Sequence, residues 1–546
     1  MAKPIGTSGG SRVFWSHVLF LVLLAVLFVA TTVPFGSRFP VSWDAGQFVL
    51  GMHHFSVTMH QPHIPGYPLF IGLGRVLHWL LPVHTSLVVV SGLFAAAALA
   101  ALYWFTWTLS REPWLCLVTS VLFLVNPVFW FYREAALTYT VDAFATILVG
   151  ALSYRALTGR GSLSYPAAVI LGLVGGVRPS VIILLLPVLL FPSLARRRFR
   201  QIPVMFLLLA ATVLVWLVPL IVLSGGWAEY QSSARQVTVR QTSFLLGGEV
   251  RITVDQSIAL IEATIGGLNV VLLPAFAGAW LWFAACRESV KKPPVEIGFF
   301  IAWVVPALLF FGLVHFGQVG YLLIVLPPAF ALAARAWLAA SRLHDSRRRF
   351  AALAILSVLL IGHGVTFPLF SWELADRLSH RQGPLGWTFK HLVRFGPVAF
   401  SMNADAIRAN DSRMQALTEI VRRYPPDRTL VVCGWPLEPR LFPKIWTQPD
   451  PFRTLAVTCP DHFIADVNLE GSFPTAKGFK TGRMPDNSTF KGIDRAIFLF
   501  EEIPETMLPQ GLLLEQRMFR DQPYYEGKVR TDFEFRGTRF KVGDGK

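Results

Sequence analysis

The sequence has few charged residues for its length. Asp, Glu, Lys and Arg make up only 15% of its 546 residues, whereas a soluble protein carries about 25%. Hydrophobic residues make up 53% of the chain and the mean hydropathy is +0.51. Runs of about 20 apolar residues recur over the first 370 positions, as in a protein that crosses the membrane many times. We therefore predict a polytopic α-helical membrane protein.

The sequence also lacks the motifs that bind soluble cofactors. We find no zinc-ligand spacing, P-loop, dinucleotide-binding fingerprint or serine-nucleophile elbow in its C-terminal 175 residues, and no obvious internal repeat in the chain. The predicted cofactor set is therefore empty, with no metal and no nucleotide.

Acidic residues are in the minority, with 33 against 49 basic residues and a formal net charge of +16. Such a charge can indicate a nucleic-acid partner. In a membrane protein, however, clustered Lys and Arg are typical of cytoplasmic loops. The positions of the basic residues favour the second interpretation, and we expect membrane lipids rather than nucleic acid as surroundings.

Apolar periodicity predicts about eleven membrane spans. We place them near residues 14–33, 85–109, 113–131, 135–154, 164–176, 180–195, 202–224, 265–285, 297–315, 319–339 and 351–370. If the N-terminus is cytoplasmic, the basic clusters between spans, such as "RRRFR" at 196–200, all lie on the cytoplasmic side. Loop 34–84 and everything after residue 370 then lie on the outer side.

Residues 161–195 are best explained by two short helices with "GGVRPS" (175–180) at their vertex. Each arm would be about 20–24 Å long at 1.5 Å per residue, shorter than the bilayer core of about 30 Å. The vertex would place Arg178 within the membrane. An arginine there is costly, so it either pairs with a buried acid or carbonyls, or has a function.

The C-terminal part, 371–546, predicts a soluble α/β domain on the outer side. Residues 403–426 have helical periodicity, and "RTLVVCGW", "RAIFLFEE" and "GTRFKV" are typical of strands. Cys433 and Cys459 lie in this part and could form a disulfide there. The predicted domains are thus 1–370, with the site in loop 34–84, and 371–546.

One acid stands out in the first outer loop, "SWDAGQFVLGMHHFSVTMHQPHIPGYPLF" at 42–70. The stretch contains Asp44, four histidines and no lysine or arginine. An outward-facing enzyme has no access to ATP or nucleotide sugars, so it needs a substrate that is already activated. A polyprenyl-phosphate sugar fits, because the lipid phosphate is its leaving group. Asp44 could act as the base, and Arg178 and Arg133 could hold the phosphate.

The same loop resembles the first outer loop of the GT-C glycosyltransferases, a group that includes protein O-mannosyltransferases and lipid A aminoarabinose transferases. The turn "HIPGYP" (63–68) is similar to the His-Pro-Pro-Gly-Tyr-Pro-like turn of that group. Further similarity lies in 126–144, 172–180 and 317–330. The resemblance implies inverting transfer from the lipid donor, with Asp44 as general base, and many members need no metal.

The chain departs from that pattern in three places. Many relatives have an Asp-Glu pair in the first loop, whereas Ala45 follows Asp44 here. The first proline of the turn is Ile64. Where relatives have an acid and a tyrosine near the fourth span, Leu137 and Tyr139 stand here. The second acidic site therefore stays open between Asp142 and Glu134.

Other polar residues are candidates for substrate binding. The loop histidines could bind metal, but their spacing matches no known frame, and we favour substrate or phosphate contacts. Asp142 could pair with Arg133 or Arg178. The predicted substrate-binding set is His60, His63, Tyr67, Arg133, Glu134, Tyr139, Asp142, Arg178, His315 and Gln318.

Two other functions stay open at this point. A transporter also places charged residues in broken helices, although it usually has an internal repeat. A non-catalytic assembly subunit could keep the same fold. Our main prediction is a glycosyltransferase of a bacterial inner membrane with its site on the outer face. Its acceptor could be a glycan, a lipid or a protein.

Overall fold

The structure is a computed structural model that describes residues 7–235, 250–268, 273–278, 295–314, 318–369, 402–434, 451–466, 492–500, 508–535 and 538–540, with a few single positions between them. The chain forms two compact units. The helical unit comprises Met1–Gly36, Tyr67–Leu73 and Val88–Ala404. The loop–sheet unit comprises Ser37–Gly66, Gly74–Leu87 and Asp405–Lys546. The predicted domain boundary near residue 370 falls outside the described ranges.

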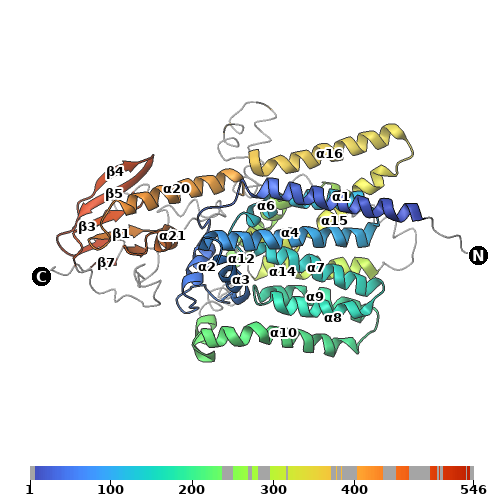
Figure 1. The fold of residues 1–546 in the computed structure, drawn as a ribbon, viewed down its shortest axis with the longest axis horizontal. Helices are drawn as coiled ribbons and strands as arrows, with labels where there is room; N and C mark the ends of the chain where they lie inside the picture. The colour runs from blue at the N-terminus through green and yellow to red at the C-terminus, as the bar shows by residue number, and fades with distance from the viewer. Residues whose placement is uncertain are drawn as a thin grey trace, which may run out of the picture. The chain divides into compact units, whose positions relative to one another are not determined.

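The helical unit is built from apolar helices that pack side by side (Figure 1). Among them, α7 contacts α8 and α9, and α8 contacts α10. The helices described are α1 (Thr7–Thr32), α4 (Val83–Ser110), α5 (Pro113–Leu124), α6 (Pro127–Arg133), α7 (Tyr139–Thr158), α8 (Ser164–Val174), α9 (Ser180–Ala195), α10 (Gln201–Leu223), α12 (Val250–Leu268), α14 (Val295–Leu313), α15 (Leu326–Ser341) and α16 (Ser346–Leu369), with the 3₁₀ turns η1 (Gly161–Leu163) and η3 (Val319–Ile324).

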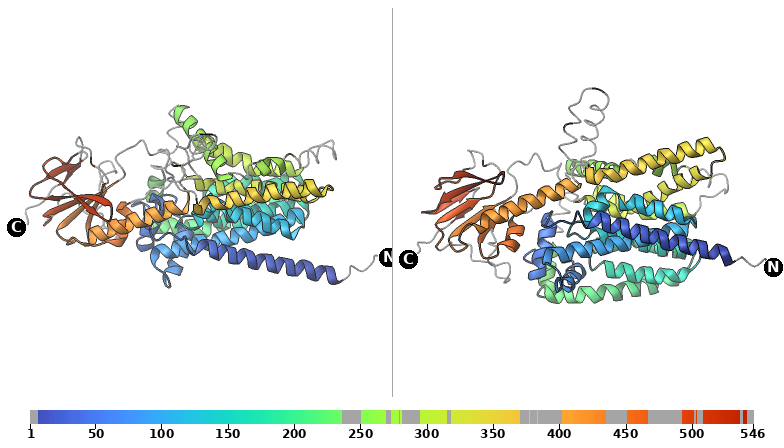
Figure 2. Two further views of the ribbon diagram at one scale, coloured as in Figure 1. Left: turned by 90° about the horizontal axis from the view of Figure 1, so that it is seen from above. Right: turned by 45° about the horizontal axis from the view of Figure 1, so that its top comes forward.

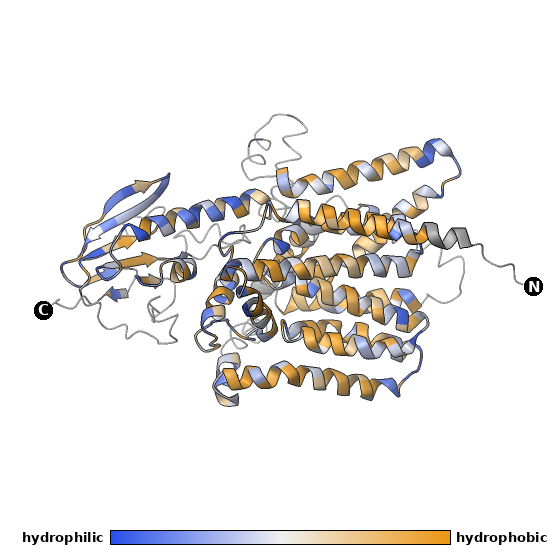
Figure 3. Ribbon diagram, viewed as in Figure 1, coloured by the Kyte–Doolittle hydropathy of each residue, from blue (hydrophilic) through white to orange (hydrophobic). Residues whose placement is uncertain are grey.

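Six of the described helices are long and apolar enough to cross a membrane, namely α1, α4, α7, α10, α14 and α16. The pair α5 and α6 is bent by 69° and forms a seventh candidate. In Figure 3 hydrophobic residues recur along these helices, whereas α20 contains many hydrophilic residues. The chain is therefore an integral membrane protein. The finer count of eleven stays a prediction, and the expected span 265–285 lies partly outside the described residues.

The predicted pair of short helices is present as α8 and α9. The vertex packs closely on its neighbours, because a Cβ at Gly176 would lie 2.6 Å from Cγ of Trp216 and 2.7 Å from Cδ1 of Leu69. The Gly176 carbonyl also accepts a hydrogen bond from the Leu69 amide at 3.1 Å. A glycine at this position allows the vertex to contact the start of α3 (Pro68–His78), which directly follows the "HIPGYP" turn.

The loop–sheet unit contains a mixed sheet of strand order β2-β1-β3-β5-β4 (Figure 2). Strand β1 is parallel to β2 and β3, whereas β5 is antiparallel to β3 and β4. The described strands are β1 (Thr429–Cys433), β2 (Phe463–Asp466), β3 (Arg495–Phe498), β4 (Glu515–Phe519), β5 (Gln522–Lys528), β6 (Phe533–Phe535) and β7 (Thr538–Phe540). Strands β1, β3 and β7 lie within segments that the sequence predicted as strands.

Alternating residues of β1 separate two apolar cores. Val431 and Cys433 face α20 (Ala404–Arg422) and α21 (Pro451–Thr458). Leu430 and Val432 face the hairpin β6–β7. This alternation follows from the period of two along a strand. The disulfide that the sequence left open is not formed, since the thiols of Cys433 and Cys459 are both free and buried. Each thiol contacts a different carbonyl, that of Ala465 for Cys433 and that of Thr418 for Cys459.

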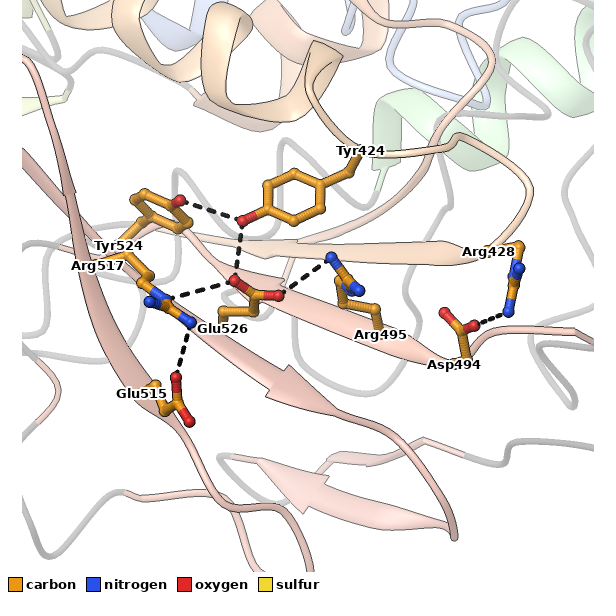
Figure 4. Close-up of polar contacts among 8 residues, drawn as sticks. All are labelled: Tyr424, Arg428, Asp494, Arg495, Glu515, Arg517, Tyr524 and Glu526. Atoms are coloured by element: carbon orange, nitrogen blue, oxygen red, sulfur yellow. Dashed lines mark hydrogen bonds and ion pairs between the residues drawn. The ribbon is translucent and has the colours of Figure 1, made fainter.

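A polar network joins the end of α20 to the sheet (Figure 4). The Tyr424 hydroxyl donates to Glu526 at 3.1 Å and accepts from Tyr524 at 3.1 Å. Arg495 and Arg517 pair with the same carboxylate at 3.2 and 3.6 Å. Burial, followed by the hydrogen bond with Tyr524, raises the pKa of Tyr424, so its hydroxyl stays protonated. Tyr424 and the two arginines thus provide hydrogen-bond and charge partners for the Glu526 carboxylate. We therefore assign the network to the stability of the sheet.

A buried arginine ties α1 to the bent pair in the helical unit. Arg133 is fully buried and pairs with Glu134 at 2.9 Å. Its Nη2 donates to both oxygens of Thr31 at 2.9 Å, and Nη1 donates to the Leu124 carbonyl at 3.2 Å. The guanidinium also lies 4.9 Å from the ring centroid of Trp130. The donors of Arg133 are thus directed at protein acceptors.

We expect Glu134→Gln to destabilise the protein, because Arg133 would keep a buried charge without its counter-ion. Breaking a buried pair costs about 3–5 kcal/mol, which predicts a clearly lower melting temperature of the detergent-purified protein. Glu112→Gln is the control, since Glu112 pairs with Arg342 at 3.6 Å in an exposed position, where about 0–1 kcal/mol is at stake. Equal melting temperatures for the two variants would contradict the structural role of Arg133.

Candidate active site

Asp44 lies in the first turn of α2 (Trp43–His53) in the loop–sheet unit. The helix begins after Ser42, whose hydroxyl accepts a hydrogen bond from the Ala45 amide at 3.3 Å. Ser is a preferred N-cap residue, and an acid in the first turn is stabilised by the helix dipole. The side chain of Asp44 is 21% exposed. The local sequence therefore holds a partly accessible carboxylate at a helix end.

His63 is the partner of Asp44, with Nε2 at 3.8 Å from Oδ1. The buried Gln47 orients this histidine, because its Oε1 accepts from the His63 amide at 3.2 Å and also contacts the ring Nδ1. An amide oxygen only accepts, so Nδ1 carries a proton and Nε2 is the nitrogen that can take one. The imidazole Nε2 therefore faces the carboxylate at a distance longer than a hydrogen bond.

Aromatic rings hold the His63 ring in place. Trp43 stacks on it with centroids 5.8 Å apart and an angle of 27°, and Phe48 does so at 6.1 Å and 22°. His60 lies 6.3 Å from the Trp43 ring, tilted by 42°. The structure thus brings together Asp44, His63 and His60, all three of which the sequence singled out.

The turn that carries His63 folds back on α2. A Cβ at Gly51 would lie 2.8 Å from Cδ of Pro62 and 3.0 Å from its nitrogen, so only glycine allows this contact. Ser56 and Gln61 exchange backbone hydrogen bonds of 2.7 and 2.8 Å that close the turn. Gly66 has φ of +96°, a conformation that favours glycine. These features explain why glycine stands at positions 51 and 66 of the loop.

A second cluster lies in the helical unit at the Arg178 vertex. Nη1 of Arg178 donates to Oδ2 of Asp142 at 2.9 Å, and both side chains are almost fully buried. The guanidinium carbon lies 4.3 Å from the ring centroid of Tyr139 and 4.8 Å from that of Tyr321. Tyr67 is also within electrostatic range of Arg178. The sequence had predicted every member of this cluster except Tyr321.

This cluster leaves hydrogen-bonding capacity in its centre. Oδ1 of Asp142 has no hydrogen-bond partner among the described residues. Arg178 has five N–H donors, and within the described part of the chain only Nη1 has a protein acceptor. Arginine binds phosphate through two parallel N–H groups. Arg178 is therefore suited to bind an anion while Asp142 neutralises part of its charge.

Close packing of η3 and Tyr132 against Tyr139 holds one side of the Arg178 cluster. A Cβ at Gly320 would lie 2.3 Å from Cγ of Tyr139, so η3 passes directly over that ring. Tyr132 packs on Tyr139 at 4.4 Å, and its hydroxyl donates to Gln318 at 3.4 Å. Gln318 thus borders the cluster through Tyr132. His315, also predicted to bind substrate, lies outside the described residues.

Arg133 and Glu134 do not join either cluster. Both side chains are fully buried, and Arg133 uses its donors on Thr31, Leu124 and Glu134. That they contact substrate stays a prediction, and their geometry favours a structural role, because a guanidinium with its donors engaged offers little to a phosphate. Asp142, rather than Glu134, is the acid that pairs with Arg178.

Sequence reasoning missed three residues. Gln47 follows Asp44 by three positions, so helical spacing alone could have placed it on the same face. Tyr321 lies in the segment 317–330 whose similarity was noted, but nothing in its spacing indicates Arg178. Arg453 contacts Trp43 from 410 positions along the chain, at 4.8 Å from the ring centroid, and no local signal indicates it. No group of three metal-ligating side chains occurs among the described residues.

Comparison with known proteins adds a family likeness. Residues 44–202 match the family model of the protein O-mannosyl-transferase TMEM260 N-terminal domain. The protein O-mannosyl-transferase tmem260 of Dictyostelium discoideum is 26% identical over 121 residues, which cover 21% of this chain and 14% of that relative. The match thus spans about one seventh of the length of the curated relative.

The fold is similar to that of a solved membrane enzyme. ArnT from Cupriavidus metallidurans bound to undecaprenyl phosphate aligns with a TM-score of 0.51 at 14% identity, over 96% of this chain and 99% of that one. Its apo state aligns with a TM-score of 0.50 at 15% identity, over 96% and 98%. The likeness to GT-C integral membrane glycosyltransferases that the sequence indicates is thus confirmed, by the fold of nearly the whole chain and by the family match of residues 44–202.

Proposed function

We propose that the chain is a membrane glycosyltransferase that moves a sugar from a polyprenyl-phosphate donor to an acceptor hydroxyl of a cell-envelope glycan, lipid or protein. The observation that carries the proposal is the pair of Asp44 with His63, whose proton-accepting nitrogen is set by Gln47. A partly exposed acid with an oriented histidine is suited to proton abstraction. The matched relatives, an O-mannosyl-transferase and ArnT, support the same class of reaction.

Arg178 is proposed to bind the phosphate of the donor. It offers unused N–H donors within an apolar helical unit, where an electrostatic interaction is stronger than in water. Asp142 and the rings of Tyr139 and Tyr321 hold the guanidinium. The bound undecaprenyl phosphate of the ArnT structure is a ligand of the chemistry that we propose for this site.

The proposed reaction is a single displacement. Asp44 takes the proton of the acceptor hydroxyl, and the acceptor oxygen forms a bond to the anomeric carbon. The bond from that carbon to the phosphate oxygen breaks, and its electron pair leaves with the lipid phosphate, which Arg178 stabilises. Inversion at the anomeric carbon follows from this attack. His63 can then receive the proton from Asp44 on Nε2.

The finer topology also belongs to the proposal. We propose about eleven spans, a cytoplasmic N-terminus, and an outer location for loop 34–84 and the α/β domain at 371–546. The support is the distribution of Lys and Arg between the apolar segments. A bacterial inner membrane is the proposed location, and the donor and acceptor would meet on its outer face.

We expect Asp44→Asn to lower sugar transfer by about 10²- to 10⁴-fold, the usual contribution of a general base, while binding of the donor is kept. The assay uses purified protein with a panel of polyprenyl-phosphate sugars, beginning with the mannose derivative, and measures released lipid phosphate and labelled acceptor. Asp345→Asn is the matched control, because Asp345 is an exposed acid that pairs with Arg348.

If Asp44→Asn transfers sugar at the wild-type rate, Asp44 is not the general base. A wild-type protein that binds donors but transfers none of the panel would speak against the enzyme and for a binding or assembly subunit. Movement of a donor across proteoliposomes without transfer would favour a transporter.

We expect Arg178→Lys to raise the donor KM by about 10- to 100-fold, because one or more charge-assisted hydrogen bonds worth about 1.5–3 kcal/mol are lost. Lysine keeps the charge beside Asp142, so folding should survive. The measurement is a titration with donor and, separately, competition by polyprenyl phosphate. Arg155→Lys is the control, since Arg155 lies 5.3 Å from the Trp104 ring on the same helical unit. Unchanged competition by polyprenyl phosphate would refute the assignment.

A further inference from the structure

The first residues of the loop that carries Asp44 are bound to α20, the helix that packs on the sheet of the same unit. The carboxylate of Asp411 on α20 accepts from the Arg38 amide at 2.9 Å and from the Phe39 amide at 3.0 Å. Asn410 donates to the Pro40 carbonyl at 3.3 Å. Burial raises the pKa of Asp411, against the effect of the two backbone N–H groups, which favour the carboxylate.

The loop also contributes to the apolar core of the sheet. Leu50 of α2 is 2% exposed and belongs to the core that contains residues of α20, α21 and the sheet. Phe39 and Met59 pack against that core. Three residues of the loop, spaced over about 20 positions, thus lose part of their apolar surface only when the C-terminal residues are folded.

Helix α21 packs directly on α2. The contact is close at Gly46, where a Cβ would lie 2.8 Å from Cβ and 3.2 Å from Cδ of Arg453. The Cβ of Arg453 is anchored to its backbone, so a side chain at position 46 would push the helices apart. The stem of Arg453 therefore lies across α2 two positions after Asp44.

The head of Arg453 begins a row of stacked groups. Arg453 is 5% exposed, and its guanidinium carbon lies 4.8 Å from the centroid of the Trp43 ring. Trp43 stacks on His63, and His63 pairs with Asp44. A guanidinium over an indole is attracted by the ring more strongly when it is desolvated, and its planar shape suits a stacked position.

We propose that Arg453 is a positioning residue for Asp44 and His63, and that the C-terminal sheet sets the geometry of the site through it. This inference rests on the proposed function, because it assigns Arg453 a part in the same reaction. Arg453 acts through Trp43 rather than on the substrate. Displacement of a reacting group by about 1 Å can cost 10²-fold in rate. A shift of Arg453 that moves Trp43 and His63 would therefore lower turnover.

The first experiment is hydrogen exchange of α2, which needs no substrate. The full-length protein in detergent is compared by mass spectrometry with Arg453→Gln and Gly46→Ala. We expect peptides that cover 43–53 to exchange at least tenfold faster in both variants, because the α2–α21 contact limits local opening. Arg423→Gln is the matched control, as Arg423 lies 3.7 Å from the Phe519 ring elsewhere in the unit. Gly72→Ala, with no atom within 4 Å, is the control for the added methyl group.

The second experiment separates positioning from general stability through steady-state kinetics with the polyprenyl-phosphate sugar that wild type uses. We expect Arg453→Gln to lower kcat by about 10- to 100-fold with the donor KM within threefold. Arg453→Lys should recover part of the rate, because it restores the charge without the planar group. Arg423→Gln should retain wild-type kcat.

The outcomes are distinct. Normal kcat and normal exchange in Arg453→Gln would overturn the inference, and so would a loss of kcat that Arg423→Gln shares. Faster exchange in α2 without a change in kcat would also overturn it, since Arg453 would then be structural only. If wild type transfers no sugar from the panel, the proposed function fails, while the exchange data still decide whether Arg453 holds the loop.

Discussion

The ion pair of Arg178 with Asp142 is the interaction on which the helical unit depends. A charge among apolar helices is tolerated only with a partner, and this pair is formed between the vertex of a short hairpin and the first turn of α7. The glycines at 176 and 320 let Leu69 and Tyr139 approach the pair closely. Aromatic rings then replace water around the guanidinium. The pair thus lies at the vertex between two short helices, and glycines stand where neighbouring side chains contact this region.

Two buried arginines have different roles because of their donors. Arg133 directs its N–H groups at Thr31, Leu124 and Glu134, so it joins helices. Arg178 donates to Asp142 through one nitrogen and keeps the others within the tyrosine cluster. An arginine with its donors engaged stabilises the fold, whereas one with spare donors can bind a ligand. Residue type and burial alone do not separate the two cases.

Much of the fold follows from local sequence, and much of the site does not. Apolar runs predicted α1, α4 and α7, because this signal acts within one segment. The side on which the basic residues must lie predicted the α8–α9 hairpin. Asp44 and His63 were found from the composition of one loop. Tyr321 and Arg453 were not, because their contacts depend on packing between residues that are 143 and 410 positions from Arg178 and Trp43. The sequence left the pairing of Cys433 and Cys459 open for the same reason, since spacing does not give the distance between thiols.

The core that Leu50 shares with α20 and α21 has a consequence for how such proteins can be recombined. Residues 37–66 and 405–546 form one folding unit although nearly 340 residues separate them in the chain. A chimera that exchanges only the C-terminal part between relatives would pair a foreign sheet with the native loop and lose the match at Gly46 and Arg453. The two segments must therefore be exchanged together, and we expect substitutions in one segment to be compensated by substitutions in the other.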